Sequence, residues 1–138
     1  MLMRSPEMVL WNAIRSDASV SALVGQKIYP NLAKASDDLP FCTWRRTGVS
    51  REQTLSDPMG MPTVSMELSI YAANYLTARQ ITDAIRQVLD GFTGSFDNTR
   101  VRHASLESES DDVIVLDGSE VPTVYSVTQD YEILWQES

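Results

Sequence analysis

Hydrophobic and polar residues alternate strictly along the segment 63–71, and the period lengthens directly after it. Apolar side chains occupy every second position, namely Val64, Met66, Leu68 and Ile70. A period of two predicts a β-strand with one buried face. From Leu76 to Gly91 the apolar residues recur three and four positions apart, which predicts an amphipathic helix. The two patterns together predict a helix that packs on a sheet.

Local residues also predict the ends of this helix. Asn74 or Thr77 can cap its first turn, and Thr77 forms a capping-box pattern with Gln80. Gly91 can adopt the left-handed backbone that ends a helix.

The remainder of the chain predicts further elements of both kinds. An apolar stripe predicts a helix over 6–16, and a short helical piece follows over 18–24, between Asp17 and Gly25. The chain turns extended at Tyr29 and Pro30. Residues 41–49, 101–108 and 123–136 are rich in β-branched and aromatic residues or alternate in polarity, which predicts three more strands. We therefore expect a sheet of about four strands with two main helices on one face.

Two long connections lie between these elements. Residues 50–62 are aperiodic and contain two prolines and a glycine, and a loop of this kind is often functional or becomes ordered only in an assembly. Residues 107–122 are expected to form an acidic connector, solvated or in an interface, with a small hairpin at Asp117–Gly118. The connector lacks basic residues and carries Glu107, Glu109, Asp111, Asp112, Asp117 and Glu120.

The length of 138 residues with 43% hydrophobic residues is sufficient for one core, so we expect one domain over 1–138. The formal charge of −8 disfavours wrapping of a nucleic-acid duplex, because such binding requires basic residues that neutralise phosphates. No apolar run approaches the length of about 18 residues that a membrane helix requires, and no secretory signal is recognisable. We expect the protein to be synthesised in a cytosol and not to associate with a membrane.

Reactive side chains are scarce. His103 and Cys42 are the single histidine and the single cysteine, which excludes a zinc site of several histidines, a CxxC pair and an internal disulfide. No nucleophile elbow or phosphate-binding glycine pattern accompanies them. Cys42 is expected to be a buried free thiol and His103 an ordinary strand residue. We predict no enzymatic activity, no cofactor and no metal.

Arg45, Arg46 and Arg51 form a small basic group beside Trp44. Such a group can bind nucleic acid, mark an exposed strand end or contact another subunit. Arginine and tryptophan are enriched at interface hot spots, which favours the subunit contact.

Several motifs in this order resemble the tail-completion, or tail-terminator, proteins of long-tailed phages, prophages and gene transfer agents. The motifs are VSALVGQKIYP over 20–30, LPFCTWRR over 39–46, an alternating strand that ends IYA, and the helix TARQITDAIRQVLDG. The resemblance covers residues 5–92 in motif order and the last two strands in arrangement.

The resemblance implies a mainly antiparallel α+β fold and a ring, typically of six copies, in the virion at the neck. Such a ring ends the tail tube, contacts the tail tube protein and the head or neck connector protein, and lets DNA pass without specific binding. A ring uses two different surfaces of each copy. We predict that one surface contains Trp44, Arg45, Arg46 and Arg51, and the other Glu107, Glu109, Asp111 and Asp112. The alternative function is a small cytosolic binding or adaptor module, which would remain monomeric or dimeric.

Overall fold

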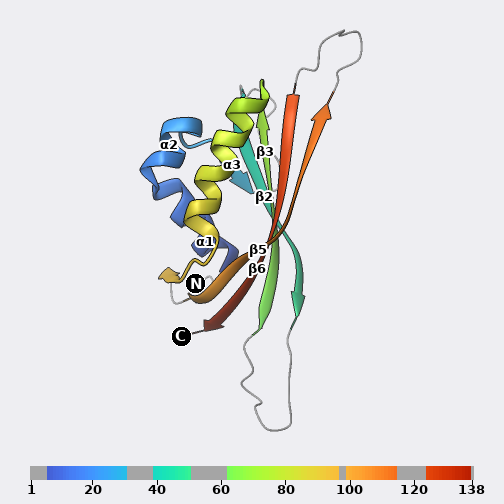
Figure 1. Ribbon diagram of the computed structural model, residues 1–138. Coiled ribbons are helices and arrows are strands. Elements are labelled where there is room, and N and C mark those ends of the chain that lie inside the picture. The colour runs from blue at the N-terminus through green and yellow to red at the C-terminus, as the bar shows by residue number, and fades with distance from the viewer. Residues whose placement is uncertain (1–5, 31–38, 51–61, 97–98, 115–123, 138) are drawn as a thin grey trace.

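The computed structural model describes residues 6–30, 39–50, 62–96, 99–114 and 124–137, which form a curved sheet with three helices on one face (Figure 1). The predicted α+β class is confirmed. The other face of the sheet carries no helix among the described residues.

The helices are α1 (Pro6–Ser16), α2 (Ala18–Val24) and α3 (Tyr75–Leu89). The Oδ1 atom of Asp17 accepts hydrogen bonds from the first backbone amides of α2, and Asn74 caps α3 by accepting from the amide of Thr77 at 2.8 Å. Asn74 rather than Thr77 is therefore the cap of α3. Gly25 and Gly91 follow α2 and α3 with positive φ angles of 62° and 81°, as predicted.

The sheet contains six strands in the order β1-β2-β3-β6-β5-β4. They are β1 (Ile28–Pro30), β2 (Phe41–Ser50), β3 (Thr63–Ala72), β4 (Gly94–Phe96), β5 (Thr99–Ile114) and β6 (Val124–Glu137). Only β1 and β2 pair in parallel, and all other neighbours are antiparallel. The prediction of about four strands is therefore too low, because β1 and β4 have three residues each and are too short to show a period.

The core lies between the helices and the sheet. The alternating residues of β3 are fully buried, and so are Ile81, Ile85 and Leu89 on α3. These two sets are the ones that the sequence periods predict to face each other. β6 contributes Val127, Tyr131, Ile133 and Trp135 to the same face, as the alternation predicts, and its Tyr125 is partly buried.

The acidic segment differs from the prediction. β5 continues to Ile114 and pairs with β6 along its whole length, so residues 107–114 are strand rather than connector. The predicted hairpin at Asp117–Gly118 and most of the loop 50–62 lie outside the described residues.

Candidate assembly surface

Arg45 lies on β2 and points to the helix-free face of the sheet. Its guanidinium donates from Nε to Oε1 of Glu67 on β3 at 3.2 Å, and its side chain is 58% exposed. Glu67 lies directly opposite Arg45 in the β2–β3 ladder. A second guanidinium nitrogen, Nη2, donates to Oε2 of Glu67 at 3.5 Å, so the ion pair spans two neighbouring strands while the side chain as a whole stays more than half exposed.

Arg46 points to the helix side of the sheet and contacts a different carboxylate. It pairs with Glu7 of α1 at 3.3 Å, and the Glu7 side chain is only 5% exposed. The second carboxylate oxygen of Glu7 is buried and has no hydrogen-bond partner among the described residues. Arg46 therefore neutralises a buried carboxylate of its own chain, which makes it important for the fold as well as for the surface.

Trp44 is part of the core, with 7% exposure, and its ring centroid lies 5.4 Å from that of Trp11 on α1. It therefore supports the strand that presents Arg45 and Arg46, and offers little surface of its own. Arg51 lies outside the described residues.

The acidic residues of β5 divide between the two faces of the sheet. Glu109 and Asp111 point to the helix side, where Arg79 of α3 donates to them at 3.0 and 3.5 Å. Arg79 also pairs with Asp83 one turn further along its own helix. The acidic run, which has no basic residue nearby in sequence, is thus partly balanced by α3. No sequence signal connects Arg79 to residues thirty positions away, so this contact was not predicted.

Glu107 and Asp112 point to the other face. Glu107 accepts a hydrogen bond from the Ser105 hydroxyl at 2.6 Å, and Asp112 accepts one from the Val113 amide at 2.8 Å. Neither forms an ion pair with any basic residue that the structure describes. These two carboxylates are therefore available for a partner.

Glu109 accepts hydrogen bonds from both Gln129 and Arg79. Partial burial by itself would raise its pKa, but hydrogen bonds from Gln129 and Arg79 and the charge of Arg79 outweigh this effect and lower it. Glu109 is therefore fully charged near neutral pH.

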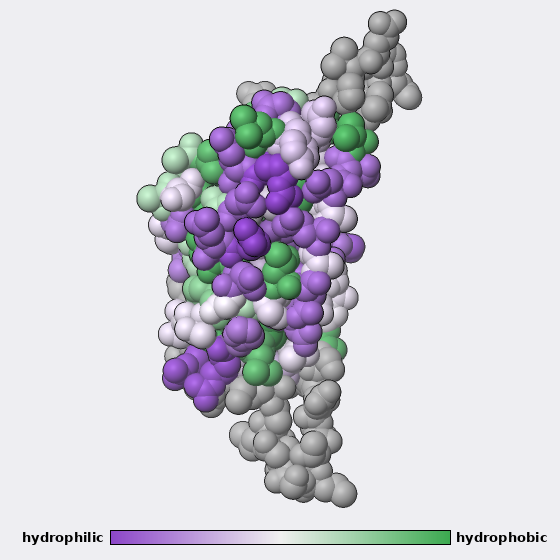
Figure 2. Space-filling view, viewed as in Figure 1, coloured by the Kyte–Doolittle hydropathy of each residue, from purple (hydrophilic) through white to green (hydrophobic). Residues whose placement is uncertain are grey.

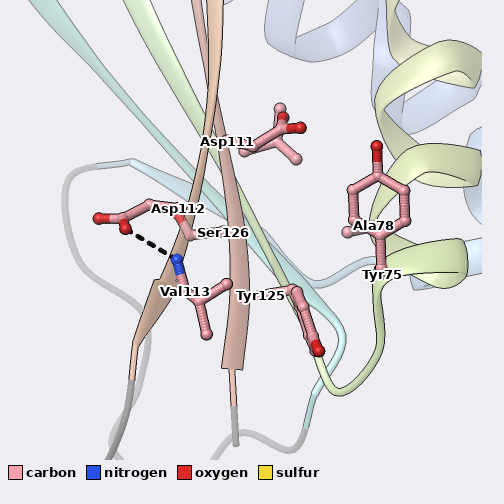
Figure 3. Close-up of a pocket in the computed structure, with 8 residues that line it drawn as sticks. Tyr75, Ala78, Asp111, Asp112, Val113, Tyr125 and Ser126 are labelled. Atoms are coloured by element: carbon pink, nitrogen blue, oxygen red, sulfur yellow. Dashed lines mark hydrogen bonds between the residues drawn. The ribbon is translucent and has the colours of Figure 1, made fainter. Parts of the chain in front are cut away.

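A cleft of about 290 Å³ lies between the start of α3 and the ends of β5 and β6. Tyr75 and Tyr125 line it with their ring centroids 6.3 Å apart. Figure 3 shows Asp111 on the side of its strand toward Tyr75 and Asp112 on the opposite side.

The described surface is predominantly hydrophilic, as Figure 2 shows for one face. The large hydrophobic residues that are exposed are Val49, Tyr75, Leu76 and Val113. Of these, Val49 lies on β2 and Val113 on β5, the two strands that carry the predicted contact residues.

The described residues contain no group of three or more potential metal ligands. Cys42 is fully buried and burial raises the pKa of its thiol to about 12, which makes the thiol unreactive. His103 lies on strand β5, as predicted, and is exposed. Among the described helices, none is long and apolar enough to cross a membrane.

Fold and surface together define a small α+β protein whose prominent features are charged strands at the margins of a sheet. The chain matches the model of the family "Tail completion protein gp17" over residues 8–135, and it belongs to this family of structural virion proteins. It is therefore a component of the tail of a phage-type virion.

A solved structure agrees with this assignment at the level of the fold. The chain resembles a chain in the virion of a native gene transfer agent particle with a TM-score of 0.76 and 14% sequence identity. The similarity covers 94% of this chain and 92% of the other. No curated protein matches the chain significantly.

Proposed function

We propose that copies of this chain form a ring, typically of six, that caps the head-proximal end of a tail tube and provides the surface to which the head joins. The family membership supports a role in completing tails. The observation that best supports a ring is that Arg45 and the acids of β5 lie on opposite margins of one sheet. A ring requires two different and complementary surfaces on each copy.

The proposed partners are further copies of the chain, the tail tube protein on one side of the ring and the head or neck connector protein on the other. DNA passes through the centre of the ring. The helix-free face of the sheet suits this passage, because beside Arg45, which pairs with Glu67, it presents the further carboxylates Glu107, Asp112, Asp130 and Glu132. Carboxylates repel phosphates, so the genome would not adhere to such a face.

Deletion of the gene from its particle tests this function. We expect the deletion to give tails that fail to join heads, and supplied protein to restore joining. Light scattering on the purified chain and electron microscopy of the particles measure the ring itself. A chain that is monomeric or dimeric both in solution and on the tail would instead support the adaptor function.

A further inference from the structure

We propose that neighbouring copies join by continuing the sheet, with β2 of one copy adding antiparallel to β5 of the next and with Arg45 opposite Asp112. This inference rests on the proposed ring and names its joint. It follows from which parts of each sheet margin the chain itself covers.

Each margin of the sheet is covered along one half and open along the other, among the residues that the structure describes. On one margin, β1 pairs with β2 from Cys42 to Trp44, and the segment from Arg45 to Ser50 has no neighbour on its outer side among the residues that the structure describes. We call this segment the β2 free edge.

On the other margin, β4 pairs with β5 only as far as Val101, and the segment that precedes β4 bonds to Ala104. The carboxylate of Asp90 then accepts from the amide of Leu106 at 3.1 Å. Beyond this point no described element pairs with the outer side of β5. We call the segment from Ser108 to Asp112 the β5 free edge.

The two free edges carry charged side chains of opposite sign, and all of these except Asp112 also form an ion pair within their own chain. The β2 free edge contains Arg45 and Arg46, and the β5 free edge contains Glu109, Asp111 and Asp112. Because two acidic edges repel each other, and two basic edges do the same, the charges favour the pairing of unlike edges. The occupant of each free edge is therefore a second copy of this chain.

The ends of the covered halves select the register. The described part of β1 reaches the position opposite Trp44, so Arg45 is the first position of β2 with no described neighbour on its outer side. On β5, the carboxylate of Asp112 already accepts from the Val113 amide, which closes the edge at that end. These two limits place Arg45 opposite Asp112 and, one residue further along, Arg46 opposite Asp111.

The lengths of the free edges match in this register. The β2 free edge has six residues, but the register shift between Arg46 and Gly48 leaves Thr47 out of the ladder. Five positions remain, and they match the five residues of the β5 free edge. Ser50 then lies opposite Ser108.

The backbone and side-chain directions also agree. Cys42 bonds outward to Lys27, so alternation directs the amide and carbonyl of Arg46 outward. On β5, the amides of Ala104 and Leu106 bond away from β6. The β5–β6 register places Asp111 at an equivalent position, so its amide and carbonyl also point outward. Arg46 and Asp111 can therefore exchange hydrogen bonds on the helix side, while Arg45 and Asp112 share the helix-free side.

The stagger of the joint fits a closed ring. Within one copy the register across the sheet runs from Arg45 to Glu67, then to Asp130 and then to Ser108, so Arg45 and Ser108 lie at the same height. Asp112, which faces Arg45 of the next copy in the proposed joint, lies four residues further along β5. Each copy therefore shifts the register by four residues, which is about 13 Å along the strand, over a width of about 19 Å for its four long strands. This ratio of shift to width corresponds to a strand tilt of about 35° to the ring axis. Closed barrels require tilts of about 35–45°.

A disulfide tests the joint. In this register Arg45 and Asp112 form a non-hydrogen-bonded pair with Cα atoms about 4.5 Å apart, which suits a disulfide. The R45C/D112C variant should give a ladder of covalent oligomers after mild oxidation, and the ladder should collapse in reductant. The matched control R45C/S108C places its cysteines about 13 Å apart in the joint and should give no ladder. Each single variant is a further control, and Cys42 remains in place because it is buried.

Oxidation is carried out both on the purified protein and on particles that carry the variant, so that a ring formed only on the tail is also probed. Hydrogen exchange of the wild-type chain provides a second measurement, in which the amides of Arg46 and Asp111 should slow by tenfold or more on assembly. A ring without the ladder and without this protection would overturn the joint and leave the proposed function intact. Absence of a ring in solution and on the particles would overturn the proposed function itself.

Discussion

Replacement of Arg79 by methionine should destabilise the fold more than the same replacement at Arg86. Both arginines lie on α3, and methionine keeps a long apolar stem and a similar helix propensity. The Arg79 side chain is 26% exposed and reaches Glu109, Asp111 and Asp83, whereas Arg86 is 49% exposed and lies 4.0 Å from Asp83 alone. The two variants therefore differ mainly in the contacts that connect α3 to β5.

The expected loss in the free energy of unfolding depends on how far the ion-paired side chains are exposed to solvent. The hydrogen bond from Arg79 to Glu109 joins two side chains that are about three-quarters buried, and the other two acids are more exposed. We expect the free energy of unfolding to fall by about 2 kcal/mol for R79M, because hydrogen bonds to charged groups exceed the value of surface ion pairs. The same free energy should fall by about 0–0.5 kcal/mol for R86M.

Urea unfolding followed by tryptophan fluorescence measures this difference, at a concentration where light scattering reports the monomer. The pH dependence gives a second test. Because the folded-state pKa of Glu109 is lowered, its stabilising contribution is present above the unfolded pKa of about 4.3 and is lost as the pH falls through the folded value. The gap between wild type and R79M should therefore narrow below pH 4. Equal losses for the two variants, or a gap that persists at low pH, would refute the role of this contact.

Three other predictions concern the surface and the thiol. R45E should weaken association by about 5- to 30-fold per contact at low salt, and D112R in the same chain should restore part of the association. Sedimentation velocity measures both effects. Normal assembly of R45E would show that Arg45 and Asp112 do not face each other in the assembly. The Cys42 thiol should resist a water-soluble disulfide reagent at pH 8 until the chain is unfolded in urea, since burial raises its pKa to about 12, and rapid reaction of the native chain would contradict this burial. Fluorescence anisotropy should detect no tight binding of duplex DNA at physiological salt, and a submicromolar dissociation constant would argue against a repulsive channel.

The elements with clear periods were predictable from sequence. β3 and α3 have their expected faces in the core because alternation and the 3.6-residue repeat reflect burial directly. The same holds for the caps at Asp17 and Asn74, where a short polar side chain bonds to amides two or three residues away. These features depend on neighbours in sequence, and neighbours in sequence are sufficient to predict them.

The C-terminal half of β5 was not predictable in this way. Its residues Glu109, Ser110 and Asp111 have low strand propensity, and the sequence indicates a connector. They are strand because β6 supplies a complete ladder opposite them and Arg79 neutralises two of the acids. Tertiary pairing overrides local preference here, and both partners are distant in sequence.

The role of the charged residues as a contact surface stays a prediction, but the structure shows how they are arranged. Arg45, Arg46 and the acids of β5 lie on opposite margins of the sheet, which the sequence could not show. Reasoning from sequence also missed that Arg46 neutralises Glu7 in its own chain. Reversal of Arg46 would leave two carboxylates beside each other at a buried site, so it would test the fold together with the contact. Arg45, whose partner Glu67 is more exposed than Glu7, is the cleaner position for that experiment.

Charged strand edges are also a protection against uncontrolled association. An open strand edge presents unpaired amides and carbonyls, and any other edge can pair with it. The net charge of −8 makes copies of this chain repel one another at most orientations. The approach that brings Arg45 and Arg46 to the acids of the β5 free edge places unlike charges opposite each other. Such a contact is head-to-tail, and in the proposed ring each added copy would present the same pair of edges until the ring closes.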